Sequence, residues 1–215
     1  MSDWIAAGRL LLCRHGQTDF NASLRFQGQL DEPLSELGRQ QAQLLAGRLA
    51  EESVDVAYTS DLCRAHETAT VALAGRPIPL HVDPRLREIA FGRWEGMTFA
   101  EIKDKYPDDV AARDRDRVHY AMPGGESLAQ LGQRVRSFME DVLPRHEGQS
   151  MLFVAHGGTV NAVISTLLDI PLTSWWRLRN HNANVSVLRF TVDGPRLASF
   201  NDTCHLHGSA DLKWP

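Results

Sequence analysis

The sequence predicts an α/β fold, a three-layer sandwich in which a mostly parallel sheet lies between two layers of helices. Three short apolar runs, over residues 9–13, 54–58 and 151–155, end abruptly in polar residues, which is typical of buried strands. Helical patterns follow these runs, as they do when helices connect parallel strands. Segments 185–192 and 196–200 alternate between apolar and polar residues, which indicates an antiparallel pair at the end of the chain.

Helix start signals follow the first two strands. Ser35 is the expected N-cap of an amphipathic helix over residues 35–49, in which Gly38 costs some stability. Ser60 or Asp61 is the expected cap of the next helix. The remaining expected elements are a strand over residues 78–82, a helix over residues 126–143 and a helix that begins after the strand at 151–155 and runs to Leu168.

We expect one domain over residues 1–215, interrupted by a cap-like excursion at about residues 92–125. The chain has 215 residues, of which 43% are hydrophobic, which is enough for one well-buried core. The excursion mixes aspartates with arginines up to Arg117. Five large apolar residues in it are interpreted first as its own packing and second as the wall of a ligand pocket: Trp94, Phe99, Tyr106, Tyr120 and Met122.

Composition narrows the class of protein. The formal net charge of −4 gives no reason to expect a nucleic-acid or membrane partner. Three cysteines do not suggest a disulfide framework, and the N-terminal residues lack the pattern of a secretory signal. We therefore expect a cytoplasmic protein. No pattern in the sequence indicates an oligomeric state.

Two arginines and two histidines stand at or just after predicted strand ends, where ligands gather in α/β folds. They are Arg14, His15, Arg64 and His156. The guanidinium fork of arginine suits phosphate oxygens, and Gly157 opens a helix whose N-terminus adds positive potential. The set predicts an anion site.

These residues lie within motifs that resemble those of the histidine phosphatase superfamily, also called the phosphoglycerate mutase-like family. The resemblance runs from about residue 9 to residue 205, in the family's order and spacing. Its blocks are residues 12–21 with Arg14-His15-Gly16, residues 26–38, residues 60–69 with Arg64, residues 86–96 with Glu88, residues 123–127 with Pro-Gly-Gly-Glu-Ser, and residues 154–158 with His156-Gly157.

The resemblance implies a phosphoglycerate mutase-like fold and a role for each matching residue. His15 is the expected nucleophile, which forms a phosphohistidine. Arg14, Arg64 and His156 are expected to surround the phosphoryl group, and Glu88 is the expected proton donor of the phosphatase branch. Two more positions that line the family's phosphate pocket are Asn21 and Gln27.

Elementary chemistry agrees with these roles. A nucleophilic histidine must be neutral, and the positive charges of Arg14 and Arg64 lower the pKa of His15. The phosphoryl transition state carries its charge on peripheral oxygens, which arginines stabilise. Bound phosphate favours the protonated form of Glu88 by like-charge repulsion, as a proton donor requires.

Other phosphatase chemistries fit less well. No cysteine is followed six residues later by an arginine, as a cysteine-dependent phosphatase requires, and Asp114-Arg115-Asp116 lies in a charged, strandless stretch. The cluster Cys204-His205-Leu206-His207 suggests a metallohydrolase, but it lies near the C-terminus, and the arginine-rich strand ends repel a cation. We therefore expect no metal and no cofactor.

The expected activity is that of a phosphomonoesterase acting on small phosphorylated metabolites. A cofactor-dependent phosphoglycerate mutase is the main alternative, because the same phosphohistidine can pass its phosphoryl group to a second hydroxyl. The resemblance favours the phosphatase. The loop that follows the glutamate in this chain, from Glu88 to Gly96, differs from the corresponding loop of the mutase branch. A catalytically weak protein that binds phosphorylated ligands is the second alternative.

Overall fold

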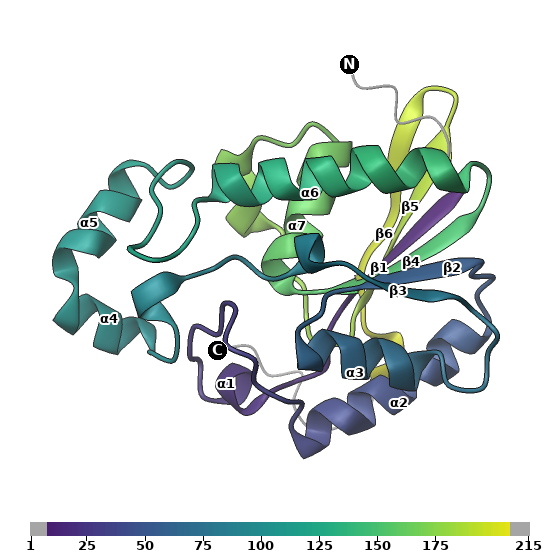
Figure 1. The fold of residues 1–215 in the computed structure, drawn as a ribbon, viewed down its shortest axis with the longest axis horizontal. Coiled ribbons are helices and arrows are strands. Elements are labelled where there is room, and N and C mark those ends of the chain that lie inside the picture. Colours follow the sequence, from purple (N-terminus) through teal and green to yellow (C-terminus); the bar gives the residue numbers. More distant parts are fainter. Residues whose placement is uncertain (1–7, 207–215) are drawn as a thin grey trace.

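The computed structural model describes residues 8–206, in which a six-stranded sheet carries helices on both faces (Figure 1). The strand order is β3-β2-β4-β1-β5-β6. The first four strands along the chain are mutually parallel, whereas β5 runs antiparallel to β1, and β6 antiparallel to β5. The prediction of a mostly parallel sheet is confirmed. The strands are β1 (Arg9–Arg14), β2 (Val56–Thr59), β3 (Leu80–Val82), β4 (Ser150–Ala155), β5 (Val185–Thr191) and β6 (Gly194–Asp202).

Two pairs of helices cover the two faces of the sheet. Helices α6 and α7 pack on one face, and α2 and α3 pack on the other (Figure 1). None of the helices in the described part of the chain is both long and apolar enough to cross a membrane. The helices are α1 (Asp19–Ala22), α2 (Glu36–Ala50), α3 (Cys63–Ala72), α4 (Phe99–Lys105), α5 (Pro107–Arg115), α6 (Leu128–Val142) and α7 (Gly157–Leu167), and the 3₁₀ helices are Pro84–Leu86, Gly92–Trp94, Leu143–His146, Leu172–Arg177 and Cys204–Leu206.

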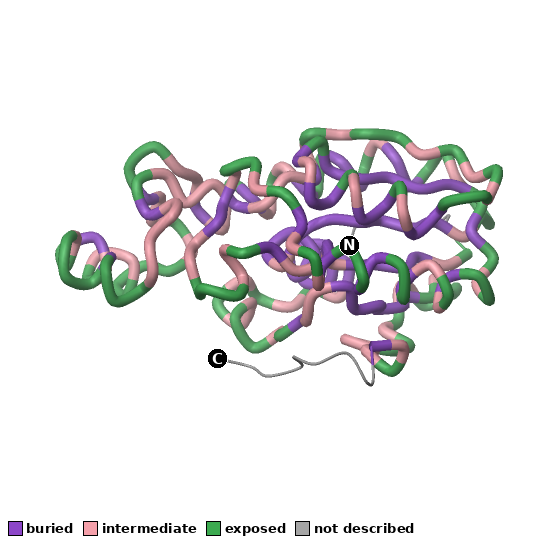
Figure 2. The backbone as a smooth tube through the Cα atoms, turned by 90° about the horizontal axis from the view of Figure 1, so that it is seen from below, coloured by how far each residue is buried: buried purple, intermediate pink, exposed green. Residues whose placement is uncertain are grey.

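Strand β1 shows how the sequence divides the core between the two faces. Leu10 and Leu12 pack with α6 and α7, whereas Leu11 and Cys13 pack with α2 and α3. Side chains alternate along a strand, so a run that is apolar throughout buries both faces. Buried backbone accordingly runs through the centre of the sheet in Figure 2.

The start of α3 differs from the prediction. Its N-cap is Leu62, whose side chain makes no capping hydrogen bond, so neither Ser60 nor Asp61 caps the helix. The backbone N–H of Cys63 instead donates to Oδ1 of Asp31, at 2.7 Å. The cap comes from a residue distant in sequence, which local cap rules do not detect.

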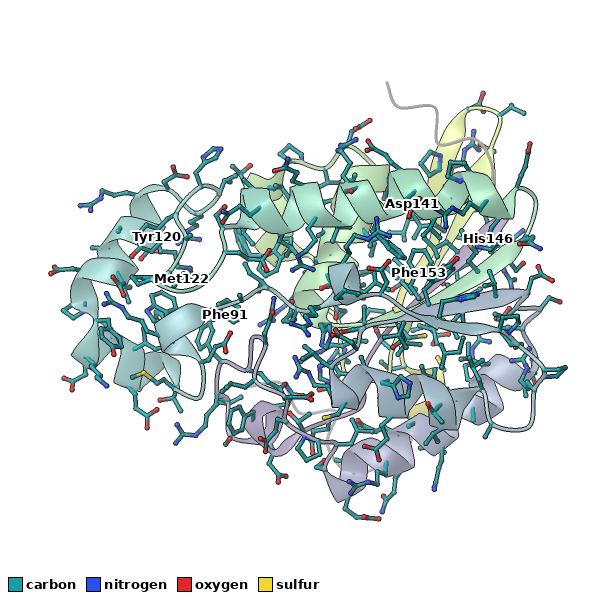
Figure 3. All side chains as sticks on the ribbon, viewed as in Figure 1. Phe91, Tyr120, Met122, Asp141, His146 and Phe153 are labelled. Atoms are coloured by element: carbon teal, nitrogen blue, oxygen red, sulfur yellow. The ribbon has the colours of Figure 1, made fainter. Side chains whose placement is uncertain are left out.

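The excursion carries α4 and α5 at one end of the molecule, away from the sheet (Figure 1). Trp94, Ile102 and Met122 form its small core, with Tyr106 and Tyr120 packed against them, while Phe99 is exposed. Buried Asp109 accepts hydrogen bonds from Trp94, Arg93 and Tyr120. The large apolar residues singled out in the sequence, except Phe99, therefore pack within the excursion. Figure 3 shows Tyr120 and Met122 there.

Gly38 is required where α2 begins beside the chain that leaves β1. A Cβ atom at Gly38 would lie 2.0 Å from the carbonyl oxygen of Gln17, and one at Gly16 would lie 2.4 Å from the carbonyl oxygen of Gly38. Both contacts involve backbone, which cannot move aside cheaply. The interpretation of Gly38 as a mere cost to the helix is incomplete, because only glycine permits this approach.

We predict opposite effects of alanine at two glycines of α2. Gly38→Ala should lower the free energy of unfolding by about 2 kcal/mol or more, because it forces two backbone segments apart. Gly47→Ala is the matched control: no atom lies within 4 Å of a Cβ there, so it should raise stability by about 0.5–1 kcal/mol. Urea unfolding measures both. Equal effects of the two substitutions would contradict this account of Gly38.

Candidate functional site

Four of the predicted site residues meet where β1 and β4 end. These strands are adjacent and parallel, so His15 and His156 emerge side by side, with ring centroids 5.1 Å apart. Arg64 reaches them from the first turn of α3, where its Nε donates to Nδ1 of His156 at 3.2 Å. Arg14 is the last residue of β1. The topology thus gathers side chains from three parts of the chain.

His15 has a defined tautomer. Its Nδ1 lies 2.6 Å from the carbonyl oxygen of Gly16. A carbonyl oxygen only accepts, so Nδ1 carries the proton and Nε2 keeps a free lone pair. Burial is the largest cause that holds the pKa of His15 well below 6.5, and the positive charges of Arg64 and Arg14 lower it further. The hydrogen bond to Gly16 acts in the opposite direction. His15 is therefore neutral at neutral pH and has one unprotonated ring nitrogen.

Three buried donors around His15 have no hydrogen-bond acceptor among residues 8–206. Because Arg64 donates to Nδ1 of His156, the proton of neutral His156 resides on Nε2, which is one of these donors. Burial lowers the pKa of His156 well below 6.5, and the charge of Arg64 adds to the effect. The other two donors are Nε of Arg14 and Nε2 of Gln27. Buried donors without acceptors are costly, so this set indicates a ligand rich in oxygen.

The site opens into a cavity of about 800 Å³. Arg14, His15, Asn21, Gln27 and Arg64 line it, together with Glu88. His156 is fully buried next to His15, and Gly157 packs near Arg14. Other residues of the lining escaped the sequence prediction: Gln17, Phe20, Ala22, Leu24, Arg25, Phe26, Gly28, Gln41, Phe91, Trp175, His181 and Asn182.

Arg64 is fully buried and held by backbone. Its two terminal nitrogens donate to the carbonyl oxygens of Leu30 and Gly28, each at 2.7 Å. Burial lowers the pKa of Arg64 to about 10, so it remains charged at neutral pH. Three of its five N–H bonds are thus used for positioning, and two remain for a ligand.

Glu88 lines the same cavity and contacts the N-terminus of α7. Its Oε2 accepts from the backbone N–H of Gly158 at 3.0 Å, and its Oε1 accepts from that of Ile89 at 2.9 Å. A Cβ at position 158 would lie 2.3 Å from Oε1 of Glu88. The second glycine after His156 therefore makes room for this carboxylate.

An ion pair holds the segment that carries Glu88. Arg134 on α6 pairs with Glu126 at 2.7 Å and donates to the carbonyl oxygens of Arg85 and Arg87. Glu126 in turn accepts from the backbone N–H of Ala90 at 3.1 Å. The Pro-Gly-Gly-Glu-Ser block leads into α6, and its glutamate supplies the carboxylate that positions this segment.

Asparagines between the 3₁₀ helix Leu172–Arg177 and β5 support Arg14, His15 and Asn21. Asn182 donates to the carbonyl oxygens of His15 and Gly16 and to Oδ1 of Asn21, at 3.0–3.3 Å. Asn180 and Asn184 accept from the side chain and backbone of Arg14, respectively. The sequence reasoning missed these residues, although asparagine at every second position from 180 to 184 was a visible signal.

Asn21 and Gln27 share a connection through Thr18. The side chain and backbone of Thr18 form a capping box with Asn21 at the start of α1. The hydroxyl of Thr18 also donates to Oε1 of Gln27 at 3.2 Å, which leaves Nε2 of Gln27 as the unpaired donor. Asn21 therefore stabilises its turn and lines the cavity as well.

The alternative nucleophiles and metal ligands lie elsewhere. Cys13 faces the core below α2 and α3, and burial raises its pKa to about 12. His205 bonds to the carbonyl oxygen of Ala183, Cys204 is exposed, and His207 lies outside the described residues. Over residues 8–206, no three His, Cys, Asp or Glu side chains converge as metal ligands would.

The low pKa values of His15 and His156 predict acid sensitivity. Below pH 6.5 the unfolded chain binds protons at these histidines while the folded chain does not, so stability falls as pH falls. The free energy of unfolding of the wild type should fall between pH 7 and pH 5. In His156→Gln it should fall by up to about 2 kcal/mol less. Urea unfolding at both pH values measures it. Exposed His66→Gln is the control, and an equal loss in all three proteins would contradict the prediction.

Comparison with known proteins agrees with this geometry. The family model of the histidine phosphatase superfamily, branch 1, matches residues 10–203. The chain is 36% identical to phosphoserine phosphatase 1 of Hydrogenobacter thermophilus over 92% of its own length and 94% of that protein.

Solved structures show the same fold. The alpha-ribazole phosphatase from Shigella flexneri superposes with a TM-score of 0.84 at 30% identity, covering 90% of this chain and 96% of that one. A mycobacterial glucosyl-3-phosphoglycerate phosphatase in complex with VO3 gives 0.82 at 36% identity, covering 91% and 99%. The expected resemblance is confirmed: the chain belongs to branch 1 of the histidine phosphatase superfamily and is a phosphoric monoester hydrolase.

Proposed function

We propose that this chain hydrolyses small phosphomonoesters without a metal ion, through a phosphohistidine at His15. The observation that carries the proposal is the state of His15, a neutral imidazole whose Nδ1 is fixed by a carbonyl and whose Nε2 is free. A general base is not needed to activate such a nucleophile.

In the first step, Nε2 of His15 attacks phosphorus and the bond from phosphorus to the ester oxygen breaks. Arg14 and Arg64, which line the cavity, supply positive charge and N–H donors to the three peripheral oxygens, and His156 and Gln27 add the unpaired N–H groups of their side chains. Charge on these oxygens dominates the transition state of phosphoryl transfer, so preorganised donors lower the barrier. The two arginines supply the positive charge that a metal ion supplies in other phosphatases.

Glu88 is the proton donor of this scheme. It lines the same cavity as His15 and accepts from the N-terminus of α7, and we expect the leaving oxygen of an ester attacked by His15 to depart beside it. Its protonated form gives a proton to the departing alcohol. In the second step, the carboxylate takes a proton from water as the water oxygen attacks phosphohistidine, which releases phosphate and restores His15 and Glu88.

Hydrolysis is favoured over mutase activity by the surroundings of the cavity. A mutase must hold a second anionic group and keep water from the phosphohistidine. The excursion pairs its arginines with aspartates, as in Arg93 with Asp109 and Arg117 with Asp114, so it presents no uniformly basic cover. Water can therefore act as the phosphoryl acceptor.

We predict that His15→Ala abolishes phosphate release, because it removes the attacking nitrogen. With a ³²P-labelled monoester, rapidly quenched wild-type protein should carry an acid-labile, base-stable label, which the variant should lack. Exposed His119→Ala is the control and should keep both activity and label.

The same assay tests the alternatives. Dialysis against EDTA should leave activity unchanged, and activity that is lost and then restored by a divalent cation would indicate a metallohydrolase. Efficient conversion of 3- to 2-phosphoglycerate with little phosphate released would indicate a mutase. A protein that binds phosphate but neither turns over nor acquires label would be a binding protein only.

We predict that Glu88→Gln slows alkyl phosphates by about 10²–10⁴-fold in single-turnover phosphoenzyme formation, the range typical of a lost general acid. p-Nitrophenyl phosphate should be slowed much less, because its leaving group departs without a proton. Glu140→Gln, an exposed carboxylate on α6, is the control. Equal losses for both ester types would show that Glu88 does not protonate the leaving group.

A further inference from the structure

Leu24 occupies a position that favours glycine. Helix α1 ends with the N–H of Arg25 donating to the carbonyl oxygen of Phe20 at 2.9 Å, and the N–H of Leu24 donating to that of Asn21 at 3.3 Å. This pair of bonds is the Schellman motif, whose penultimate residue adopts the left-handed conformation. Leu24 has a φ of 57°, which a side chain branched beyond Cβ adopts at a cost.

Core packing does not offset this strain. Leu24 is 52% exposed and lines the cavity. Strained residues that persist at a site are a reason to suspect function. The leucine contributes an apolar surface to the cavity that glycine would not.

The cavity lining contains, besides Leu24, a group of aromatic side chains that we call, together with Leu24, the outer wall. Phe20, Phe26, Phe91 and Trp175 line the same cavity. Phe26 and Phe91 meet edge to face with centroids 4.9 Å apart, and the indole N–H of Trp175 donates to the carbonyl oxygen of Gly158 at 3.2 Å. Phe91 lies where the excursion joins the body of the molecule (Figure 3).

The arginines that line the cavity either serve the phosphoryl site or are already paired with a carboxylate. Arg14 and Arg64 lie at the strand ends, beside His15. Arg25 also lines the cavity, but its guanidinium pairs with Glu101 at 2.8 Å and donates to the carbonyl oxygen of Gly96. A second carboxylate or phosphate on the substrate would therefore meet a neutralised arginine in a lining that also carries the carboxylate of Glu88.

We propose that Leu24 is a specificity-determining residue and that the cavity selects phosphomonoesters whose leaving group is uncharged and apolar or aromatic. This inference rests on the proposed function, because the leaving group occupies the outer wall only if the phosphoryl group lies at His15. Leu24 and the aromatic wall contact the part of the substrate that departs as the alcohol.

The test compares primary alkyl phosphates of similar leaving-group chemistry: 3-phenylpropyl phosphate, glycerol 3-phosphate and O-phosphoserine. Wild-type kcat/KM should be at least about tenfold higher for the phenylpropyl ester than for phosphoserine. Leu24→Gly should lower kcat/KM for the phenylpropyl ester by about tenfold, chiefly through KM, because one apolar contact of this size contributes that much discrimination. Its kcat/KM for glycerol 3-phosphate should fall much less, because that leaving group has little apolar surface to lose contact with Leu24.

Thermal unfolding separates a specificity role from a structural one. Relief of the strained backbone should leave the Tm of Leu24→Gly equal to or above that of the wild type. Asp169→Gly is the matched control, since Asp169 has a φ of 53° in an exposed turn after α7, outside the cavity lining. The Tm of Asp169→Gly should also equal or exceed that of the wild type, and this variant should keep the wild-type substrate preference.

Three results would overturn the inference. They are a wild-type preference for phosphoserine, an equal loss for all substrates in Leu24→Gly, and a clear fall in its Tm. In each case phosphate release and the His15 label could persist, so the proposed function would stand. Loss of the label at wild-type His15 would instead refute the proposed function.

Discussion

The burial of positive charge at the ends of β1 and β4 is the constraint on which the rest of the structure depends. Arg64 is fully buried beside His15 and His156, and Arg14 is the last residue of β1. Charges taken out of water are costly unless hydrogen bonds compensate for them. Here the compensation comes from carbonyl oxygens of Gly28, Leu30 and Asn180. The arginines keep their charge, and the histidines, which can lose theirs, remain neutral.

This division of charge explains much of the surrounding backbone. The loop after α1 must turn so that two of its carbonyls face Arg64, and the chain after the 3₁₀ helix Leu172–Arg177 must bring its asparagines to Arg14 and His15. Glycine at 16 and 38 lets α2 approach the same point. The loops around the site are thus shaped by the need to solvate guanidinium groups inside the protein.

The fold was predictable because its signals are local and repeated. A run such as residues 9–13 buries both faces of a strand, and Ser35 caps α2 as its position suggests. The cap of α3 was not predictable in this way, because Asp31 reaches Cys63 from a distant loop. The positions of His15, Arg64 and His156 at one edge followed from the parallel topology, and their roles remain a prediction from resemblance and chemistry.

The supporting residues were harder to predict, because their function depends on contacts between segments far apart in sequence. Arg134 is an ordinary helix arginine in the sequence, and only the fold brings it to the carbonyl oxygens of Arg85 and Arg87. Asn182 acts through three acceptors on two segments about 160 residues away. The outer wall was likewise assigned to the excursion, whereas Phe20, Phe26 and Trp175 come from other parts of the chain.

The buried donors that lack acceptors have a consequence for the product. Inorganic phosphate offers the same oxygens to Nε of Arg14, Nε2 of Gln27 and Nε2 of His156 as an ester does. Any ligand that binds only the folded chain stabilises it by mass action, by about 2.7 kcal/mol at a concentration one hundred times its Kd. The features that prepare the site for phosphoryl transfer therefore also make it retain its product, so that phosphate in the surroundings both slows turnover and protects the fold against unfolding.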